Sequence, residues 1–426
     1  MKSFSNKSIF LNGFFLALLL SFTFQQFSIS TAITPIRPYM IMVSIGGIIF
    51  SLNKFRVKLT TIDIFLSVLY LYMMATFIYS EEISLSIQMF FGLNLLLYSY
   101  FILRIFIYQY SLNEFVEKIY FIAKWFFILS FFLYVIGVLA HYLFDVSIVL
   151  EGGGNRAVLL GVYFEGGITP RMRGLCDSPN NFGMYAIIML PVWLNYSPGI
   201  KWWQLSIVSI MLILSFSTTM FLALICMFFI FILNKFFNSN GKVSRKLLVL
   251  IIFYTILFFV ISGSIYFVFL DGLSADLNAV IGYKLDRVSS GSGRFELWQY
   301  SWSLISENPV FGYGLNQARI VLAPYRQVNS THNNFLEVML EGGVGGLLLY
   351  LFLLSSVFVT VFSKSMMKKE RQWVLITLVG LFIFSNANVN LYSDSFIFCL
   401  AIIATLPLLK NTDPFKNGRP EKQINC

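Results

Sequence analysis

Charged residues are scarce in this sequence of 426 residues, since only 12% are Asp, Glu, Lys or Arg while 58% are hydrophobic. An average soluble domain has roughly 25% charged residues, so the composition excludes a water-soluble globule. Apolar runs close to the roughly 20 residues that a membrane helix needs recur along the chain, which disfavours a barrel of alternating strands. The composition therefore predicts an all-α integral membrane protein.

Cysteine and histidine are also few. Of the four cysteines, only Cys176 falls in a loop predicted on the non-cytoplasmic side, so no disulfide pair is available there. The two histidines, His141 and His332, have no Cys or Asp cluster at metal-ligand spacing, so we expect no metal and no other cofactor. We attribute the net charge of +10 to membrane topology and expect no nucleic-acid partner.

Twelve apolar segments predict about 12 transmembrane helices, and we interpret the first as a retained span because no small-residue cleavage site follows it. The segments are residues 9–29, 38–52, 62–79, 83–107, 118–144, 180–197, 201–215, 217–234, 246–269, 333–362, 371–388 and 394–409. With the N-terminus inside, twenty basic residues are cytoplasmic and nine are on the other side, which predicts that both termini are cytoplasmic. The whole chain, 1–426, is expected to form a single polytopic membrane domain.

Two loops, residues 145–179 and 270–332, are longer than the other connections, and both fall on the non-cytoplasmic side, called the outer side below. Long loops in compact proteins usually carry function or disorder. The second loop contains SGRFELWQYSWSLISENP, where Phe295, Trp298 and Trp302 recur at helical spacing. This pattern predicts an interfacial helix, and we expect the catalytic motifs in these loops.

The first loop ends in TPRMRGLCDSPNNFG, which places Arg171, Arg173 and Asp177 just before the sixth apolar segment. The planar guanidinium group binds phosphate oxygens bidentately and keeps its charge, so the two arginines suit a lipid-linked diphosphate. An alternative is that the two arginines anchor the loop to anionic lipid headgroups, which explains the same spacing. Asp177 can simply form an ion pair with an arginine.

Arg294 opens the predicted helix of the second loop, and the glycine-containing string PVFGYG follows that helix. Glycines in such a string permit a tight turn. Arg294 is a candidate for binding a substrate, but it can equally be a solvated residue that pairs with Glu296 or Glu307.

His332 precedes the tenth apolar segment, and Asn333 is available to cap that helix. The positive end of a helix dipole disfavours imidazolium and keeps the neutral ring that a general base requires. A structural hydrogen-bonding role is the alternative. Glu337 and Glu341 share one face near the start of this segment, where ionisable groups are costly and often functional. The glycines of EGGVGG predict close helix contact or a kink.

The order of these motifs resembles the O-antigen ligase and polymerase superfamily of bacterial surface-polysaccharide assembly. The matching strings are RMRGLCDSPNNFG, SGRFELWQYSWSLISENPVFGYG and THNNFLEVMLEGGVGG. One departure is LSFSTTMFLAL, which has no arginine where relatives often carry a serine–arginine pair. The resemblance implies a metal-independent glycosyltransferase with its active site at the periplasmic face of the bacterial inner membrane, acting on glycan carried by undecaprenyl diphosphate.

The resemblance also implies roles for individual residues. By position, it assigns diphosphate binding to Arg173, Arg171 and Arg294, catalysis to His332 together with Arg294, and supporting roles to Asn333, Glu341 and Asp177. The expected partners are the lipid-linked donor, a glycan or lipid A-core acceptor, membrane lipids and a chain-length regulator.

The motifs leave more than one function open. We favour a polymerase that joins repeat units into O-antigen, capsule or exopolysaccharide, and the alternative is a ligase that transfers the polymer to lipid A-core. A hypothesis from a different functional class is that the protein is a polysaccharide transporter or flippase. Transporters tend to place ionisable groups near the midplane and to show internal repeats, whereas the apolar segments here are almost free of charge in their interiors.

Overall fold

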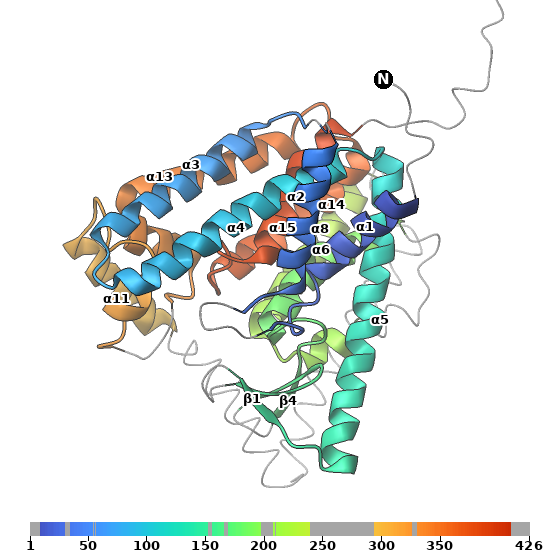
Figure 1. The fold of residues 1–426 in the computed structure, drawn as a ribbon, viewed down its shortest axis with the longest axis horizontal. Coiled ribbons are helices and arrows are strands. Elements are labelled where there is room, and N and C mark those ends of the chain that lie inside the picture. The colour runs from blue at the N-terminus through green and yellow to red at the C-terminus, as the bar shows by residue number, and fades with distance from the viewer. Residues whose placement is uncertain are drawn as a thin grey trace, which may run out of the picture.

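The computed structural model describes residues 9–29, 35–53, 55, 57–151, 156–165, 169–196, 208, 210–238, 294–325 and 330–409. The predicted ninth segment, 246–269, lies outside the described residues, as do most of the seventh segment and the second outer loop before residue 294. The described chain forms a bundle of helices with a small sheet at one end (Figure 1).

The helices of the bundle are α1 (Ile9–Ser21), α2 (Pro38–Leu52), α3 (Thr61–Ala75) with η1 (Thr76–Tyr79), α4 (Ile83–Ile107), α5 (Leu112–Phe144), α6 (Pro179–Tyr196), α8 (Thr218–Asn238), α13 (Asn334–Val361), α14 (Lys368–Ser385) and α15 (Asp394–Thr405) with η3 (Leu406–Leu408). Each overlaps one of the predicted apolar segments. Two further helices, α11 (Arg294–Glu307) and α12 (Ala318–Val321), lie in the second outer loop.

Side-chain caps explain where several of these helices begin. Ser111 accepts from the Glu114 amide while the Glu114 carboxylate accepts from the Ser111 amide, which is a reciprocal capping box at the start of α5. Asn333 caps α13, as predicted, and Ser393 caps α15 by accepting from the Phe396 amide. These bonds satisfy amides that have no partner within the helix.

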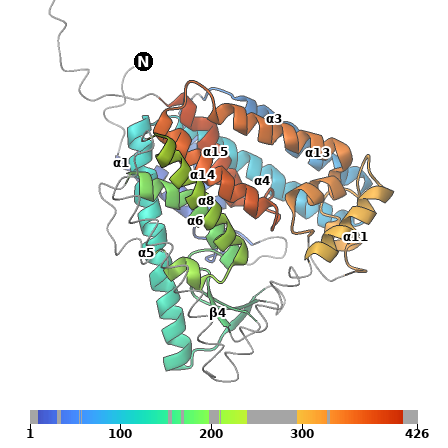
Figure 2. The same ribbon diagram turned by 180° about the vertical axis from the view of Figure 1, so that it is seen from behind.

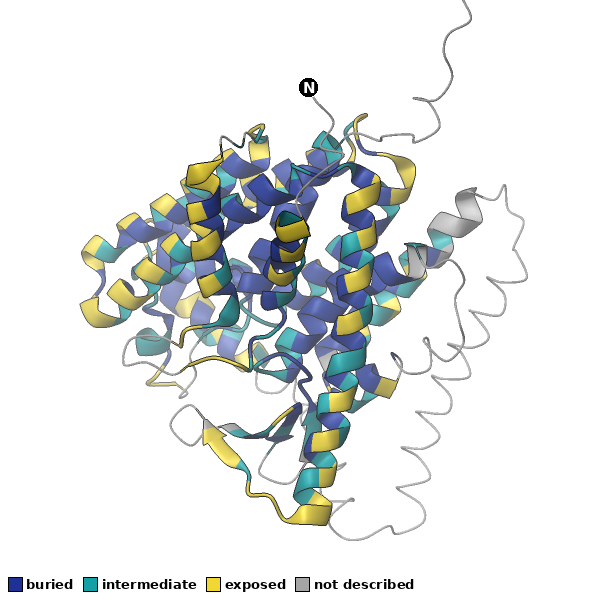
Figure 3. Cartoon of the chain, turned by 45° about the vertical axis from the view of Figure 1, so that its right-hand side comes forward, coloured by how far each residue is buried: buried dark blue, intermediate teal, exposed yellow. Residues whose placement is uncertain are grey.

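Four of the described helices are long and apolar enough to cross a membrane: Thr61–Tyr79, Ile83–Ile107, Leu112–Phe144 and Asn334–Val361. Exposed residues lie along the outward faces of the helices, while the residues between helices are buried (Figure 3). Many of the exposed side chains are large and apolar, including Phe91, Phe132 and Phe358. This surface suits lipid and not water, so the fold is that of a multi-pass helical membrane protein. The total of about 12 spans stays a prediction.

Helix α5 is longer than a bilayer requires. Its 33 residues extend about 50 Å, whereas the hydrocarbon core is about 30 Å thick. The last turns of α5 contact an antiparallel sheet of β1 (Val149–Glu151), β2 (Arg156–Leu159), β3 (Val162–Glu165) and β4 (Thr169–Met172), in that order. Gly137 of α5 and Gly161 of the sheet allow this contact, because a Cβ at either position would overlap backbone atoms. The sequence analysis did not predict this sheet.

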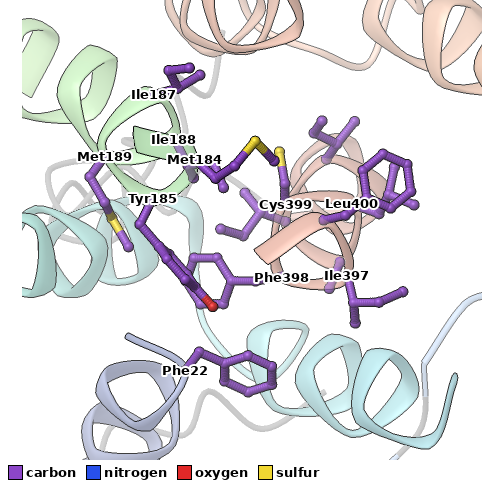
Figure 4. Close-up of a cluster of buried hydrophobic side chains, with 14 of the residues drawn as sticks. Phe22, Met184, Tyr185, Ile187, Ile188, Met189, Ile397, Phe398, Cys399 and Leu400 are labelled. Carbon is purple, nitrogen blue, oxygen red and sulfur yellow. The ribbon is translucent and has the colours of Figure 1, made fainter. Parts of the chain in front are cut away.

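The core of the bundle lies where α6 and α15 meet. Tyr185 of α6 and Phe398 of α15 have ring centroids 5.9 Å apart, and Phe22, just after α1, lies 5.5 Å from Phe398 (Figure 4). Seen from behind, α8 and α14 run beside this pair, and α13 runs beside α3 (Figure 2). The core therefore joins helices from both ends of the chain.

Helix α13 is broken at Gly343, whose φ of +61° is not helical, so the predicted kink is confirmed. The PVFGYG loop fills the break and pairs with backbone groups that the kink leaves without helical partners. The amides of Tyr313 and Gly314 donate to the carbonyls of Leu340 and Glu341 at 2.8 and 2.9 Å, and the Val344 amide donates to the Pro309 carbonyl at 2.9 Å. Two separate motifs of the sequence thus form one interlocked unit.

We expect Gly343→Ala to destabilise the protein by at least about 2 kcal/mol, because an L side chain is strained at this φ and its Cβ would overlap the Val310 carbonyl oxygen. Thermal unfolding of the detergent-solubilised protein measures the change. Gly13→Ala in α1 is the matched control, since a Cβ there has no neighbour within 4 Å. Equal melting temperatures for the two variants would contradict the interlocked arrangement.

Candidate functional site

An asparagine loop, residues 386–393 between α14 and α15, joins the outer ends of α6 and α13. Asn180 of α6 donates to the Asn388 side-chain carbonyl at 3.2 Å. Asn334 of α13 donates to the Asn390 side-chain carbonyl, and its own Oδ1 accepts from the Asn390 amide at 2.8 Å. The loop thereby links the end of the first outer loop to the helix that follows His332.

Sequence reasoning missed this loop, although a signal was present. The string SNANVNLYSDS is a dense polar run between two apolar segments, on the side where the charge bias places the outer loops. Its amides and hydroxyls cannot face hydrocarbon without partners, so the run predicts a buried polar contact even though it contains no recognisable catalytic pattern.

Arg37, just before α2, forms a second connection that sequence reasoning did not predict, called the Arg37 clasp below. Its guanidinium donates to Asp177 at 2.8 Å and to Asp394 at 3.0 Å. Gln25 also donates to Asp394, at 2.6 Å, and Asn181 donates to Asp177 at 2.6 Å. The clasp ties the segment after α1, the start of α6 and the start of α15 together. The predicted arginine partner of Asp177 is therefore Arg37.

The two carboxylates determine the charge state of the clasp. Burial by itself would lower the pKa of Arg37, but the attraction of Asp394 and Asp177 outweighs burial and holds that pKa above its ordinary value. Arg37 therefore stays charged at any physiological pH. Because the two carboxylates neutralise the guanidinium charge, the clasp has no net positive charge that could attract an anionic ligand.

Arg173 is almost fully buried, with 3% of its surface exposed. Its Nε donates to the Leu160 carbonyl at 2.8 Å, and its Nη1 lies 3.4 Å from the Asp177 carbonyl. Arg173 therefore attaches the turn between β2 and β3 to the start of α6. The predicted site residue lies beside the Arg37 clasp, in contact with one of its members.

Arg171 lies on β4 and reaches the junction where the seventh apolar segment meets the eighth. Its Nη1 is 3.3 Å from Glu165, and its Nε donates to the Ser215 carbonyl at 3.0 Å. This junction is the LSFSTTMFLAL string, which lacks an arginine of its own. An arginine of the first outer loop thus contacts the junction between these two segments.

His332 is presented on a short turn in front of α13. Its φ of +57° is in the left-handed region, which is strained for a residue with a Cβ and persists only where the surroundings hold it. The Thr331 amide donates to Glu337 at 2.8 Å, and the Trp298 indole donates to the Thr331 carbonyl at 3.0 Å. On the other side of His332, Asn333 accepts from two amides of the first turn of α13. The predicted position of His332 before a capped helix is confirmed.

Helix α11 carries Arg294 to the same end of α13. The predicted helix is confirmed, since it begins at Arg294 and ends before Pro309. Its buried side, with Leu297 and Leu304, packs against Leu340 of α13, and Trp298, one turn after Arg294, bonds to Thr331 as described above. Arg294 is thus the first residue of α11, and His332 lies just before the cap of α13, the helix against which α11 packs.

Glu341 joins the break in α13 to the asparagine loop. Its carboxylate is buried and accepts from the hydroxyl of Tyr392 at 3.1 Å. Glu337, one turn earlier, holds the Thr331 amide as described above. The two acidic residues predicted on one helix face therefore support the kink and the histidine turn.

Arg173, the left-handed His332 and the asparagine loop thus lie at the outer ends of the helices. Residues 204–351, about a third of the chain, match the family model described as O-Antigen ligase. The match confirms the resemblance to the O-antigen ligase and polymerase superfamily, and its range contains Arg294, His332 and Glu341. It supports ligase and polymerase alike and gives no support to a transporter. No curated protein matches the chain.

We expect Arg37→Met to lower the free energy of unfolding by about 3 kcal/mol, because it leaves Asp177 and the buried Asp394 facing each other without a cation. Thermal unfolding in detergent measures the loss, and Lys364→Met, at an exposed position, is the control. Adding Asp394→Asn should restore part of the stability. A double variant less stable than Arg37→Met would contradict the electrostatic role of the clasp.

Proposed function

We propose that the protein is an integral-membrane glycosyltransferase of the bacterial inner membrane. It acts at the periplasmic ends of its helices on glycan carried by undecaprenyl diphosphate and polymerises the repeat units of a surface polysaccharide. The observation that carries the proposal is the turn at His332, which lies within the region that matches the family model. His332 has a left-handed backbone, and hydrogen bonds to its neighbours Thr331 and Asn333 hold that turn in place. Helix α11, which begins at Arg294, packs beside it.

The proposed reaction follows from the chemistry of these groups. The acceptor hydroxyl attacks the anomeric carbon of the donor, the bond from that carbon to the diphosphate oxygen breaks, and His332 accepts the hydroxyl proton. Negative charge builds on the leaving diphosphate, where Arg294 and either Arg173 or Arg171 stabilise it. A single displacement inverts the anomeric centre. The arginines supply the charge stabilisation, so the proposal requires no metal.

A second candidate is ligation, in which lipid A-core supplies the acceptor hydroxyl. The family match, to the model described as O-Antigen ligase, supports ligation as well as polymerisation. Deleting the gene separates the two candidates. A single repeat unit on lipid A-core identifies a lost polymerase, whereas undecorated core with polymer left on the lipid carrier identifies a lost ligase.

We expect His332→Ala and Arg294→Ala each to lower glycan transfer at least about a hundredfold, because the first removes the general base and the second removes a charge that stabilises the leaving group. Both proteins should remain in the membrane at normal levels. The measurement is formation of long-chain polysaccharide in a deletion strain that expresses each variant.

The matched control is His141→Ala, because His141 is the chain's other histidine and lies near the end of α5 against the ring of Phe164. This variant should keep its activity. Wild-type polysaccharide in the His332→Ala strain would disprove the catalytic assignment of that residue.

A further inference from the structure

A pocket of about 270 Å³ lies at the outer end of the bundle, between α2 and α4. One wall consists of Met89, Gly92, Leu95 and Leu96 of α4, and Met40 of α2 lies on the other side. The lining residues of α4 lie in the first four turns of that helix, within about 20 Å of its outer end. In a membrane, the pocket lies at the depth of the outer leaflet.

The walls of the pocket are continuous with the lipid-facing surface. Phe91 also lines the pocket and is 61% exposed, on a helix long and apolar enough to cross the bilayer. Gly92 leaves space, because a Cβ there would meet only the Met89 sulfur, at 4.0 Å. The pocket therefore suits a hydrocarbon chain, and the missing side chain at Gly92 leaves room for methyl branches.

The polar end of the pocket belongs to the candidate site. Arg37 and Asp394 of the Arg37 clasp line it, together with Tyr392 of the asparagine loop. Tyr392 in turn donates to Glu341 beside the kink of α13. A chain held in this pocket therefore ends against the loop that joins α6 to α13. Because two carboxylates offset the charge of Arg37, the pocket is suited to the hydrocarbon of a lipid and not to its diphosphate.

We propose that this pocket binds the isoprenoid segment next to the diphosphate of the donor's polyprenyl carrier. The inference rests on the proposed function and adds the place where the carrier enters the protein, between α2 and α4. These two helices are neighbours in the fold (Figure 1). The pocket holds the isoprenoid part of the substrate. The diphosphate then extends from the polar end of the pocket toward the arginines and His332.

The test is Gly92→Leu, which adds a side chain to the pocket lining at a position where a Cβ would meet only the Met89 sulfur. A photoreactive isoprenyl diphosphate should label α4 of the wild-type protein, and undecaprenyl phosphate should compete while phosphatidylglycerol should not. Gly92→Leu should lose the labelling. It should also raise KM for the lipid-linked donor about tenfold without changing kcat, because displacing two methylene groups costs about 1.4 kcal/mol.

Gly13→Leu in α1 is the matched control, since position 13 also has open space around it and lies outside the pocket. It should keep both labelling and KM. Leu95→Phe adds volume to the same wall of the pocket and is a second, independent variant that should also lose labelling. Retained labelling in both pocket variants, or equal competition by phosphatidylglycerol, overturns the inference. Failure of the proposed function has a different signature, namely intact labelling of α4 in a protein that transfers no glycan.

Discussion

Polar groups inside a helical membrane bundle must find partners within the protein, because hydrocarbon offers none. This constraint accounts for the main tertiary contacts at the outer end of the molecule. The break in α13 is tolerated because the PVFGYG loop pairs with its carbonyls and amide. The asparagine loop pairs with Asn180 and Asn334, and the Arg37 clasp pairs Arg37 with Asp177 and Asp394, so both join polar side chains of different segments. Polar pairing therefore acts beside apolar packing, such as that of α11 on α13, in arranging the outer helix ends.

The same contacts organise the candidate site. His332 occupies a strained turn that Glu337, Trp298 and Asn333 hold from both sides. Arg173 and Arg171 attach the small sheet to α6 and to the junction before α8, so the arginines of the first outer loop are part of the scaffold as well as candidates for binding. The site is built from short segments that lie far apart in the sequence.

Much of this architecture could be predicted from sequence, because apolar length and helix caps are local properties. Segments 38–52 and 83–107 coincide with α2 and α4 at both ends, and the glycine kink and the helix at Arg294 are confirmed. The Arg37 clasp could not be predicted, since Arg37 is 140 and 357 residues away from Asp177 and Asp394 and no local pattern pairs them. The sheet was missed because its strands have only three or four residues each, too few for a clear alternation.

The Arg37 clasp has a consequence for the order in which the protein is made. Arg37 emerges from the ribosome before Asp177, and Asp177 before Asp394, so the clasp closes only after α15 has been delivered to the membrane. Asn390, which the start of α13 requires, also arrives late. A chain that stopped after α13 would therefore carry the arginines and the histidine of the candidate site, yet would lack Asn388 and Asn390, which bond to the starts of α6 and α13. The contacts that arrange the candidate site thus depend on residues that follow all of its arginines and its histidine in the sequence.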